Sequence, residues 1–285
     1  MHPVEIASRD GLTLPSYLTL PPGSDSDADG VPDAPVPMVL LVHGGPWARD
    51  GYGYNSYHQW LANRGYAVLS TNFRGSTGFG KNFISAGNLE WGRKMHDDLL
   101  DAVNWAVERG VTSQDSVAIM GGSYGGYASA WGATALSEEY AAAVMFVGIS
   151  NQISKFGTTD IPMEMYNVHA RKWPWQDWQG MLEVSPIYHV DKAETPILIM
   201  HGDSDTRVSP SQSYELYRNI KVRKPDTPVR LVLYPGEGHG NRQAAARYDY
   251  NLRMMQWFDT YLKTGDRDAD MPAPRPELKI EDGED

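Results

Sequence analysis

The sequence contains no cysteine, which excludes disulfides, thiolate metal ligands and a cysteine nucleophile. It also lacks any run that approaches the ~20 apolar residues of a membrane-spanning helix. The first residues, Met1 to Glu5, carry neither the basic start nor the apolar stretch of a secretory signal. We therefore expect a cytoplasmic protein with no membrane partner.

Basic residues are outnumbered by acidic ones, 25 Lys and Arg against 36 Asp and Glu, which gives a formal net charge of −11. Proteins that bind nucleic acid neutralise its phosphates with clustered Lys and Arg, and the sequence contains no such cluster. We therefore expect no nucleic-acid partner. We also expect neither a metal nor a cofactor, because several histidines lie in no metal-ligand spacing. These are His58, His96, His169 and His189.

One acidic stretch imitates the start of a calcium-binding loop. Asp25, Asp27 and Asp29 alternate along the chain, and Gly30 takes the sixth position, as in a loop that wraps a hard cation. The twelfth position, however, is Val36, where such loops have a bidentate glutamate. We favour a solvated acidic loop between two strands and keep calcium binding as the weaker alternative.

The length and composition are those of one globular domain. With 285 residues, of which 41% are hydrophobic, the chain can bury a sizeable core. We expect a single domain over residues 1–264. Residues 265–285 are polar, acidic and proline-containing, so we expect a tail that is disordered or extended over the surface.

Short apolar runs predict a sheet. The strong turn signal Asp10-Gly11 separates residues 4–7 from residues 12–20 and predicts an antiparallel hairpin. Later runs alternate with helical patterns, which is typical of a mostly parallel sheet with helices on both faces and sites at the carboxyl ends of its strands. These runs are Val39 to Val42, Ala67 to Thr71, Val117 to Met120, Ala143 to Val147, Ile197 to Met200 and Arg230 to Leu233. The predicted apolar helix faces are Met95, Leu99, Ala102, Val103 and Ala106, and Leu252, Met255, Phe258 and Leu262.

The most informative feature is the glycine-rich run from Gly121 to Gly126, which directly follows the apolar segment 117–120. A G-x-S-x-G sequence between a strand and a helix is typical of the nucleophile elbow, a strained turn that exposes a serine hydroxyl at the sheet edge. Ser123 is therefore the candidate nucleophile. A side chain at Gly121 or Gly125 would collide with neighbouring backbone where the turn is tightest.

A serine hydroxyl is a poor nucleophile at neutral pH unless a histidine accepts its proton and a carboxylate orients that histidine. In folds with this elbow, the acid and then the histidine follow later strands. Asp205 follows the run 197–200 and His239 follows the run 230–233, so the chain order is the required one. His201, at the end of a strand, is expected to bond to backbone.

Five motifs occur in the order HGGP (43–46), NFRGSTGFG (72–80), GGSYGGY (121–127), HGDSDTRV (201–208) and PGEGHG (235–240). Together they resemble the catalytic domain of the prolyl oligopeptidase family, and its acylaminoacyl-peptidase-like branch in particular, from about Pro3 to Lys263. The resemblance implies an α/β-hydrolase fold with Ser123 as nucleophile and His239 as general base. It also selects Asp205 over Asp203 as the orienting acid, because the acid in this pattern stands two positions before the arginine.

Members of this family usually carry an N-terminal β-propeller that screens the active site. This chain begins about where such a propeller would end, so we interpret it as a catalytic domain without the propeller. For a domain excised from an exported protein, the expected cytoplasmic location would not hold.

Acyl transfer also needs backbone N–H groups that stabilise the oxyanion. One donor is expected from the amide of Tyr124, the residue after the nucleophile. The resemblance implies the other from Gly45, in a loop whose alternative interpretation is a plain glycine-rich turn. It also places Val208, Ile149 and the Tyr124 ring at an apolar pocket for the residue before the scissile bond. For Val208 and Ile149, core packing is the stronger interpretation.

Two features near the expected site have open roles. Arg207 either pairs with Asp203 or Asp205 as structural support, or binds a substrate carbonyl as the corresponding arginine does in some family members. The irregular excursion over residues 151–192 carries aromatic residues that either shape the acyl pocket or pack as a satellite cluster. These aromatics are Phe156, Tyr166, Trp173, Trp175 and Trp178.

These features predict a serine hydrolase that forms an acyl-enzyme intermediate. The resemblance favours cleavage of peptide bonds in short or N-terminally blocked peptides. A carboxylesterase acting on small acyl esters is the close alternative, because the same machinery hydrolyses esters. A catalytically idle binding module is a third and weaker alternative, and formation of a homo-oligomer is left open.

Overall fold

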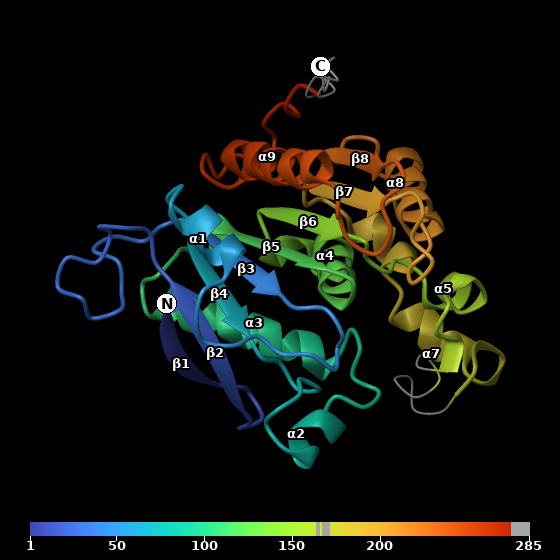
Figure 1. The fold of residues 1–285 in the computed structure, drawn as a ribbon, viewed down its shortest axis with the longest axis horizontal. Helices are drawn as coiled ribbons and strands as arrows, with labels where there is room; N and C mark the ends of the chain where they lie inside the picture. The colour runs from blue at the N-terminus through green and yellow to red at the C-terminus, as the bar shows by residue number, and fades with distance from the viewer. Residues whose placement is uncertain (164–165, 167–171, 275–285) are drawn as a thin grey trace, which may run out of the picture.

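The computed structural model describes residues 1–163, 166 and 172–274. Its centre is an eight-stranded sheet with the strand order β1-β2-β4-β3-β5-β6-β7-β8 (Figure 1). The strands are β1 (His2–Ala7), β2 (Thr13–Thr19), β3 (Met38–Val42), β4 (Ala67–Thr71), β5 (Val117–Gly122), β6 (Ala142–Phe146), β7 (Ile197–Gly202) and β8 (Val229–Tyr234).

The N-terminal hairpin forms the antiparallel part of this sheet. β1 pairs with β2, with Ile6 opposite Leu14, and β2 pairs antiparallel with β4. Gly11 in the turn has φ +86°, a conformation that favours glycine. The remaining neighbours in the strand order pair in parallel. The predicted hairpin and the mostly parallel sheet are therefore confirmed.

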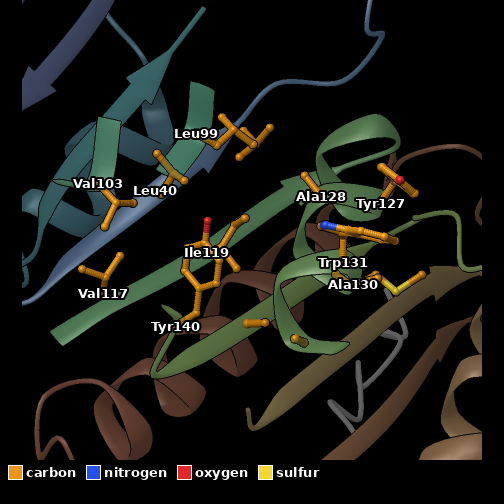
Figure 2. Close-up of a cluster of buried hydrophobic side chains, with 14 of the residues drawn as sticks. Leu40, Leu99, Val103, Val117, Ile119, Tyr127, Ala128, Ala130, Trp131 and Tyr140 are labelled. Atoms are coloured by element: carbon orange, nitrogen blue, oxygen red, sulfur yellow. The ribbon is translucent and has the colours of Figure 1, made fainter. Parts of the chain in front are cut away.

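Helices cover both faces of the sheet, since its central strands are apolar on both sides. The helices of the described residues include α1 (Ser56–Ala62), α2 (Lys81–Ser85), α3 (Lys94–Glu108), α4 (Tyr124–Thr134), α5 (Gln152–Thr158), α7 (Trp178–Glu183), α8 (Ser211–Arg223) and α9 (Ala244–Tyr261), of which α2, α5 and α7 lie away from the sheet (Figure 1). On one face, Leu40 of β3 and Ile119 of β5 share a hydrophobic cluster with Leu99 of α3 and Tyr127 of α4 (Figure 2). On the other face, Met120 of β5 belongs to a second cluster with residues of α1 and α9.

β5 and β7 each run two residues further toward their carboxyl ends than the apolar runs predict. β5 continues through Gly121 and Gly122, which pair with β6, and β7 continues to Gly202, which pairs with Tyr234. Glycine adds no apolar signal to a sequence pattern, but its backbone still joins the hydrogen-bonded ladder. The extension of β5 puts Ser123 immediately after the strand.

The predicted apolar face of α3 is confirmed, because all of its predicted residues are buried. The face of α9 is only partly as predicted. Met255, Phe258 and Leu262 are buried, but Leu252 is only partly buried. The buried face of the helix is wider than predicted and includes several further aromatic residues. The additional buried residues are Tyr250, Met254, Trp257 and Tyr261.

The described part of the C-terminal tail packs on the domain. The Arg267 guanidinium donates a hydrogen bond to the carbonyl oxygen of Tyr140 (2.8 Å), and Gln256 of α9 donates one to that of Ala273 (3.2 Å). The part of the predicted tail over residues 275–285 lies outside the described residues. Among the described helices, none is both long enough and apolar enough to cross a bilayer.

We expect Gly126→Ala to destabilise the fold, because α4 meets the segment after β6 at this point. An added Cβ would lie 2.6 Å from the carbonyl oxygen of Phe146 and 2.7 Å from the Cα of Gly148. The free energy of unfolding, measured by urea denaturation, should fall by about 1–3 kcal/mol. Gly157→Ala in α5 is the matched control, since nothing lies within 4 Å of its added Cβ. Equal stability of the two variants would contradict the close packing.

Candidate active site

Ser123 occupies a strained turn between β5 and α4. Its backbone has φ 59° and ψ −115°, a conformation that costs a non-glycine residue about 1–3 kcal/mol. Two hydrogen bonds hold the turn, from the Ser123 N–H to the carbonyl oxygen of Phe146 (3.0 Å) and from the Tyr127 N–H to that of Ser123 (2.9 Å). The sequence-based prediction of a strained strand-to-helix turn at Ser123 is confirmed.

The glycines beside Ser123 are required by a close backbone approach. A Cβ on Gly121 would meet the carbonyl oxygen of Val42 and lie 2.7 Å from the Cα of Gly125. A Cβ on Gly125 would meet the same Val42 oxygen and lie 3.3 Å from the carbonyl oxygen of His43. The collision predicted for both glycines is confirmed, and the partner in it is the end of β3.

The loops after β7 and β8 bring Asp205 and His239 together. His239 Nδ1 lies 2.8 Å from the Asp205 carboxylate. The loops are joined at their base, because the N–H groups of Asp203 and Ser204 donate to the carbonyl oxygens of Tyr234 (3.1 Å) and Glu237 (2.9 Å). Asp203 itself accepts from the Gly236 N–H (2.8 Å). The structure thus gives His239 the acid that the sequence selected.

Asp205 is buried and accepts four hydrogen bonds. One oxygen accepts the N–H groups of Arg207 (2.9 Å) and Val208 (3.0 Å). The other lies 2.8 Å from His239 Nδ1 and 3.2 Å from His201 Nε2. Burial alone would raise the pKa of Asp205, but these hydrogen bonds outweigh it and hold that pKa well below its usual range. The carboxylate is therefore ionised at neutral pH, and the Nδ1 of His239 that faces it carries a proton.

His201 is a contact of the acid that sequence reasoning missed. Its Nε2 lies 2.8 Å from the carbonyl oxygen of Val208, as the predicted backbone bond requires, and its Nδ1 lies 2.6 Å from the Ser213 hydroxyl. Because Nε2 faces two acceptors, it carries the ring proton. The signal that points to this contact is the spacing of four residues between His201 and Asp205 across the end of β7.

The HGGP loop passes directly over the elbow. A Cβ on Gly44 would lie 3.4 Å from the Cβ of Ser123 and 3.2 Å from the carbonyl oxygen of Gly122. Gly45 follows with φ +117°, which again favours glycine. The Tyr124 amide begins α4 beside Ser123. The assignment of the Gly45 and Tyr124 amides as oxyanion donors stays a prediction that this arrangement supports.

Stacked rings connect the two loops that carry these amides. The His43 ring stacks on Phe73 at 4.5 Å, and Phe73 stacks on Tyr124 at 5.0 Å between centroids. The His43 nitrogens lie 2.7 Å from the carbonyl oxygen of Gly44 and 2.9 Å from the Ser76 hydroxyl. Burial lowers the pKa of His43 to about 4, so the ring is neutral at neutral pH. The stack fixes the HGGP loop relative to the elbow.

The NFRGSTGFG loop that supplies Phe73 and Ser76 is anchored by a buried arginine. Arg74 forms two hydrogen bonds with Asp98 of α3 (2.8 and 2.7 Å) and two with Asp10 of the hairpin turn (2.9 and 2.8 Å). Such bidentate pairs fix direction as well as distance. This network gives the loop, which the sequence identified only by resemblance, a structural role.

The residues predicted for the substrate pocket have different environments. Val208 and Ile149 are each 1% exposed and belong to the large hydrophobic cluster, as their core interpretation requires. The Arg207 guanidinium pairs with Asp160 (2.6 Å), a partner that the sequence did not suggest, and its backbone N–H donates to Asp205 (2.9 Å). Its alternative role in binding a substrate carbonyl stays a prediction. Asp160 lies in the irregular excursion, whose approach to the acid loop is a tertiary contact that no sequence pattern reveals.

Four of the five aromatic residues predicted in the excursion pack against one another, while Trp178 of α7 is 54% exposed. Trp173 and Trp175 stack at 5.4 Å, and Phe156 meets both rings edge-on at 5.4 and 5.7 Å. Tyr166 lies 4.5 Å from Trp173. Trp175 is nevertheless 66% exposed. The rings thus form the predicted satellite cluster, while the exposed face of Trp175 stays free for the alternative role in an acyl pocket.

The acidic loop does bring its carboxylates together. Oxygens of Asp25, Asp27 and Asp29 lie within 4.8 Å of one another. Backbone N–H groups already use these oxygens, since Asp25 accepts from Gly30 (3.0 Å) and Asp29 (3.2 Å). The preference for a solvated acidic loop stays a prediction.

Three histidines that the sequence places in no metal-ligand spacing have a hydrogen-bond partner. His58 lies between the hydroxyls of Thr19 (2.9 Å) and Ser70 (2.8 Å). His96 lies 3.2 Å from the Tyr140 hydroxyl, and His189 lies 2.8 Å from the carbonyl oxygen of Glu183. His169 lies outside the described residues.

Comparisons with known proteins agree with this geometry. Residues 52–265 match the model of the prolyl oligopeptidase family. Dipeptidyl aminopeptidase BIII of Pseudoxanthomonas mexicana is 52% identical over 250 residues, which cover 84% of this chain and 35% of that protein. The human acylamino-acid-releasing enzyme is 35% identical over 266 residues, which cover 88% of this chain and 34% of that enzyme. The chain thus spans about a third of the length of these relatives.

Solved structures show the same fold. The uncomplexed acylaminoacyl peptidase of Pyrococcus horikoshii superposes with a TM-score of 0.83 over 92% of this chain and 41% of that chain. Its sequence is 23% identical, so this likeness concerns the fold alone.

We expect stability to fall as the pH rises from about 4 to about 7 because of Asp50, which lies in the loop after β3. Burial raises the pKa of Asp50 to about 7, and one of its carboxylate oxygens has no hydrogen-bond partner among the described residues. The unfolded chain releases this proton near pH 4, so ionisation favours the unfolded state across that interval. Asp50→Asn should reduce the fall in melting temperature between pH 5 and pH 8. An unchanged pH dependence would contradict a neutral Asp50.

Proposed function

Because the chain belongs to the prolyl oligopeptidase family, we propose that it is a serine peptidase that cleaves short or N-terminally blocked peptides through an acyl-enzyme intermediate. Ser123 is the nucleophile, His239 the general base and Asp205 the orienting acid. The observation that carries the proposal is the His239–Asp205 pair at 2.8 Å, on the loops that follow β7 and β8, at the same carboxyl edge of the parallel strands as β5, which leads into the strained Ser123.

The acylation step follows from the proton on His239. With Nδ1–H facing Asp205, Nε2 has a free lone pair that accepts the Ser123 proton while Oγ attacks the scissile carbonyl carbon. The carbonyl π electrons move to oxygen, and the Gly45 and Tyr124 amides stabilise that oxyanion. As the oxyanion collapses, the C–N bond breaks and His239 gives its proton to the leaving amine.

Deacylation repeats these steps with water as the nucleophile. His239 accepts a proton from water as its oxygen bonds to the acyl carbon, and the same amides stabilise the second oxyanion. The bond between the acyl carbon and Ser123 Oγ then breaks, and His239 returns the proton to Oγ. The ionised Asp205 stabilises the imidazolium in both halves of the reaction.

Peptide hydrolysis is favoured over the carboxylesterase alternative by the names of the relatives. The two relatives reported above are named as an aminopeptidase and an acylamino-acid-releasing enzyme. The proposed machinery would also accept activated esters, so ester turnover alone does not distinguish the two functions. Amide turnover does.

We expect Ser123→Ala to lower kcat for aminoacyl-p-nitroanilides by about 10⁴-fold or more, because the nucleophile acts as one unit with its base. Asp205→Asn should lower kcat by about 10⁴-fold, because His239 would then adopt the tautomer in which Nε2 carries the proton and cannot accept one from Ser123. Asp203→Asn is the matched control, since Asp203 binds the Gly236 N–H instead of His239. Equal losses in the two aspartate variants would contradict the assignment of the acid.

A parallel assay of p-nitrophenyl esters, aminoacyl-p-nitroanilides and N-acetyl-aminoacyl substrates tests the reaction class. We expect turnover of amide substrates and labelling of Ser123 by a fluorophosphonate. Ester turnover without amide turnover would replace the peptidase by a carboxylesterase. If no substrate reacts and no label is incorporated, the proposed function is wrong and the binding-module alternative replaces it.

We also expect Trp175→Ala to raise KM for substrates with a large acyl side chain by about tenfold, with kcat little changed, through loss of the exposed indole face. Urea denaturation should show that stability is retained, since Trp175 is mostly exposed. Tyr248→Ala, at an exposed aromatic residue of α9, is the control. Unchanged specificity at intact stability would reject the pocket role and leave the satellite cluster.

A further inference from the structure

A cavity of about 140 Å³ lies on the sheet face opposite the predicted acyl pocket, between α1, the end of β6 and α9. Tyr57 and Trp60 of α1, Phe146 of β6 and Tyr250 of α9 form its aromatic walls. Asn241 and Arg247 complete it on the side of the histidine loop. Its volume is close to the roughly 150 Å³ that accommodates benzene in an engineered cavity, so it has room for one aromatic ring, such as that of phenylalanine.

The cavity adjoins the segments that form the candidate active site. The carbonyl oxygen of Phe146 accepts the Ser123 N–H (3.0 Å), and a Cβ on Gly122 would lie 3.6 Å from the Phe146 ring. Asn241 follows His239 by two residues. α1 is the first helix after the HGGP loop. Phe146 in one wall of the cavity therefore accepts a backbone hydrogen bond from Ser123. Asn241, in another part of the lining, lies two residues after His239.

The residues predicted for the acyl half of a peptide substrate and the residues that line the cavity belong to different hydrophobic clusters, on opposite faces of the sheet. Val208, Ile149 and Tyr124, predicted for the acyl side, belong to the cluster of α3 and α4. Tyr250 and Phe146 belong to, or pack against, the cluster of α1 and α9. His239 must protonate the leaving amine, so the leaving half of the substrate has to lie beside the histidine loop. That is the side on which the cavity lies.

The charge at the cavity is unusual for this acidic protein. Among the described residues, none that lines the cavity is acidic, and Arg247 is its single cation. Arg253, less than two turns further along α9, pairs with Asp249 (2.5 Å), whereas no carboxylate in the described part of the chain lies within ion-pair distance of Arg247. An unpaired guanidinium at an aromatic cavity favours an anion, and its planar donor fork matches a carboxylate.

Other groups at the cavity agree with a polar ligand. Burial raises the pKa of Tyr57, and a hydrogen bond with Tyr250 and the charge of Arg247 both oppose that rise. The Trp60 indole nitrogen and the Asn241 side-chain oxygen are buried with no hydrogen-bond partner among the described residues. Buried polar atoms without partners are rare in folded proteins, and they mark groups that a ligand or water would satisfy.

We propose that this cavity binds the amino acid that leaves on the carboxyl side of the scissile bond, with Arg247 bound to its free α-carboxylate. The proposal rests on the proposed peptidase function and makes it more specific. The substrates are peptides in which the bond cleaved is the last one, so that the leaving group is a single residue. The aromatic walls receive its side chain, and Arg247 sets the distance from the scissile bond to the chain end.

The test compares three substrates with one shared acyl part, chosen as the one turned over fastest as its p-nitroanilide. The leaving groups are phenylalanine, phenylalanine amide and p-nitroaniline. Wild-type protein should prefer the free acid over the amide by about tenfold in kcat/KM, the effect of one charge-assisted pair. Free phenylalanine should also inhibit p-nitroanilide hydrolysis more strongly than phenylalanine amide does.

Variants then assign the preference to one side chain. Arg247→Met should remove it by lowering kcat/KM for the acid about tenfold, while the amide and the p-nitroanilide change less than about twofold. Arg247→Lys should restore part of it. Arg242→Met is the matched control, because this exposed arginine is close to His239 in the sequence but lies outside the cavity lining. It removes the same charge and should keep the preference.

The outcomes separate this proposal from the function on which it rests. Equal turnover of acid and amide by wild-type protein would overturn the subsite while leaving the peptidase intact. An equal loss on all three substrates in Arg247→Met, or loss of the preference in Arg242→Met, would also overturn it. Absence of any p-nitroanilide turnover would instead contradict the peptidase function. The comparison of the acid and amide substrates with wild-type protein tests the subsite even if a variant does not fold.

Discussion

The structure depends on the contact between the end of β3 and the turn after β5. Val42 lies so close to Gly121 and Gly125 that neither position admits a Cβ. This contact forces Ser123 into a conformation with φ 59° that most residues avoid, and it brings the HGGP loop across the nucleophile. The strain persists because packing on both faces of the sheet, together with the register of β3, β5 and β6, leaves the turn no relaxed alternative.

A second constraint positions Asp205 and His239, the proposed acid and base. Gly202 lies directly against the backbone of Glu237 and Gly238, so the loops after β7 and β8 act as one unit. The buried Glu237 carboxylate also accepts the N–H groups that follow the histidine loop, at Arg242 and Gln243 (both 2.8 Å). Asp205 is thereby held in a site that satisfies its charge with four donors. A carboxylate this well satisfied stays ionised and keeps the His239 tautomer fixed.

Much of this could be predicted from the sequence because the signals are local. The glycines of the elbow, the order of serine, acid and histidine, and the turn at Gly11 all lie within short segments whose backbone requirements are specific. The contacts that the sequence did not reveal join distant segments. Arg207 pairs with Asp160 of the excursion, and His201 bonds to Ser213 of α8. The cavity beside Arg247 forms only when α1, β6 and α9 pack together. Glycine adds no apolar signal, so the sequence pattern did not show that β5 and β7 extend to Gly122 and Gly202.

The central claim is that Ser123, His239 and Asp205 act together beneath the Gly45 and Tyr124 amides. A crystal structure of the protein after reaction with an aminoalkyl diphenyl phosphonate tests it most directly. The account predicts phosphorus bonded to Ser123 Oγ and one phosphoryl oxygen within about 2.7–3.1 Å of both amides. It also predicts His239 beside Oγ and still bonded to Asp205. A phosphoryl oxygen directed away from both amides, or an adduct on another residue, would contradict it.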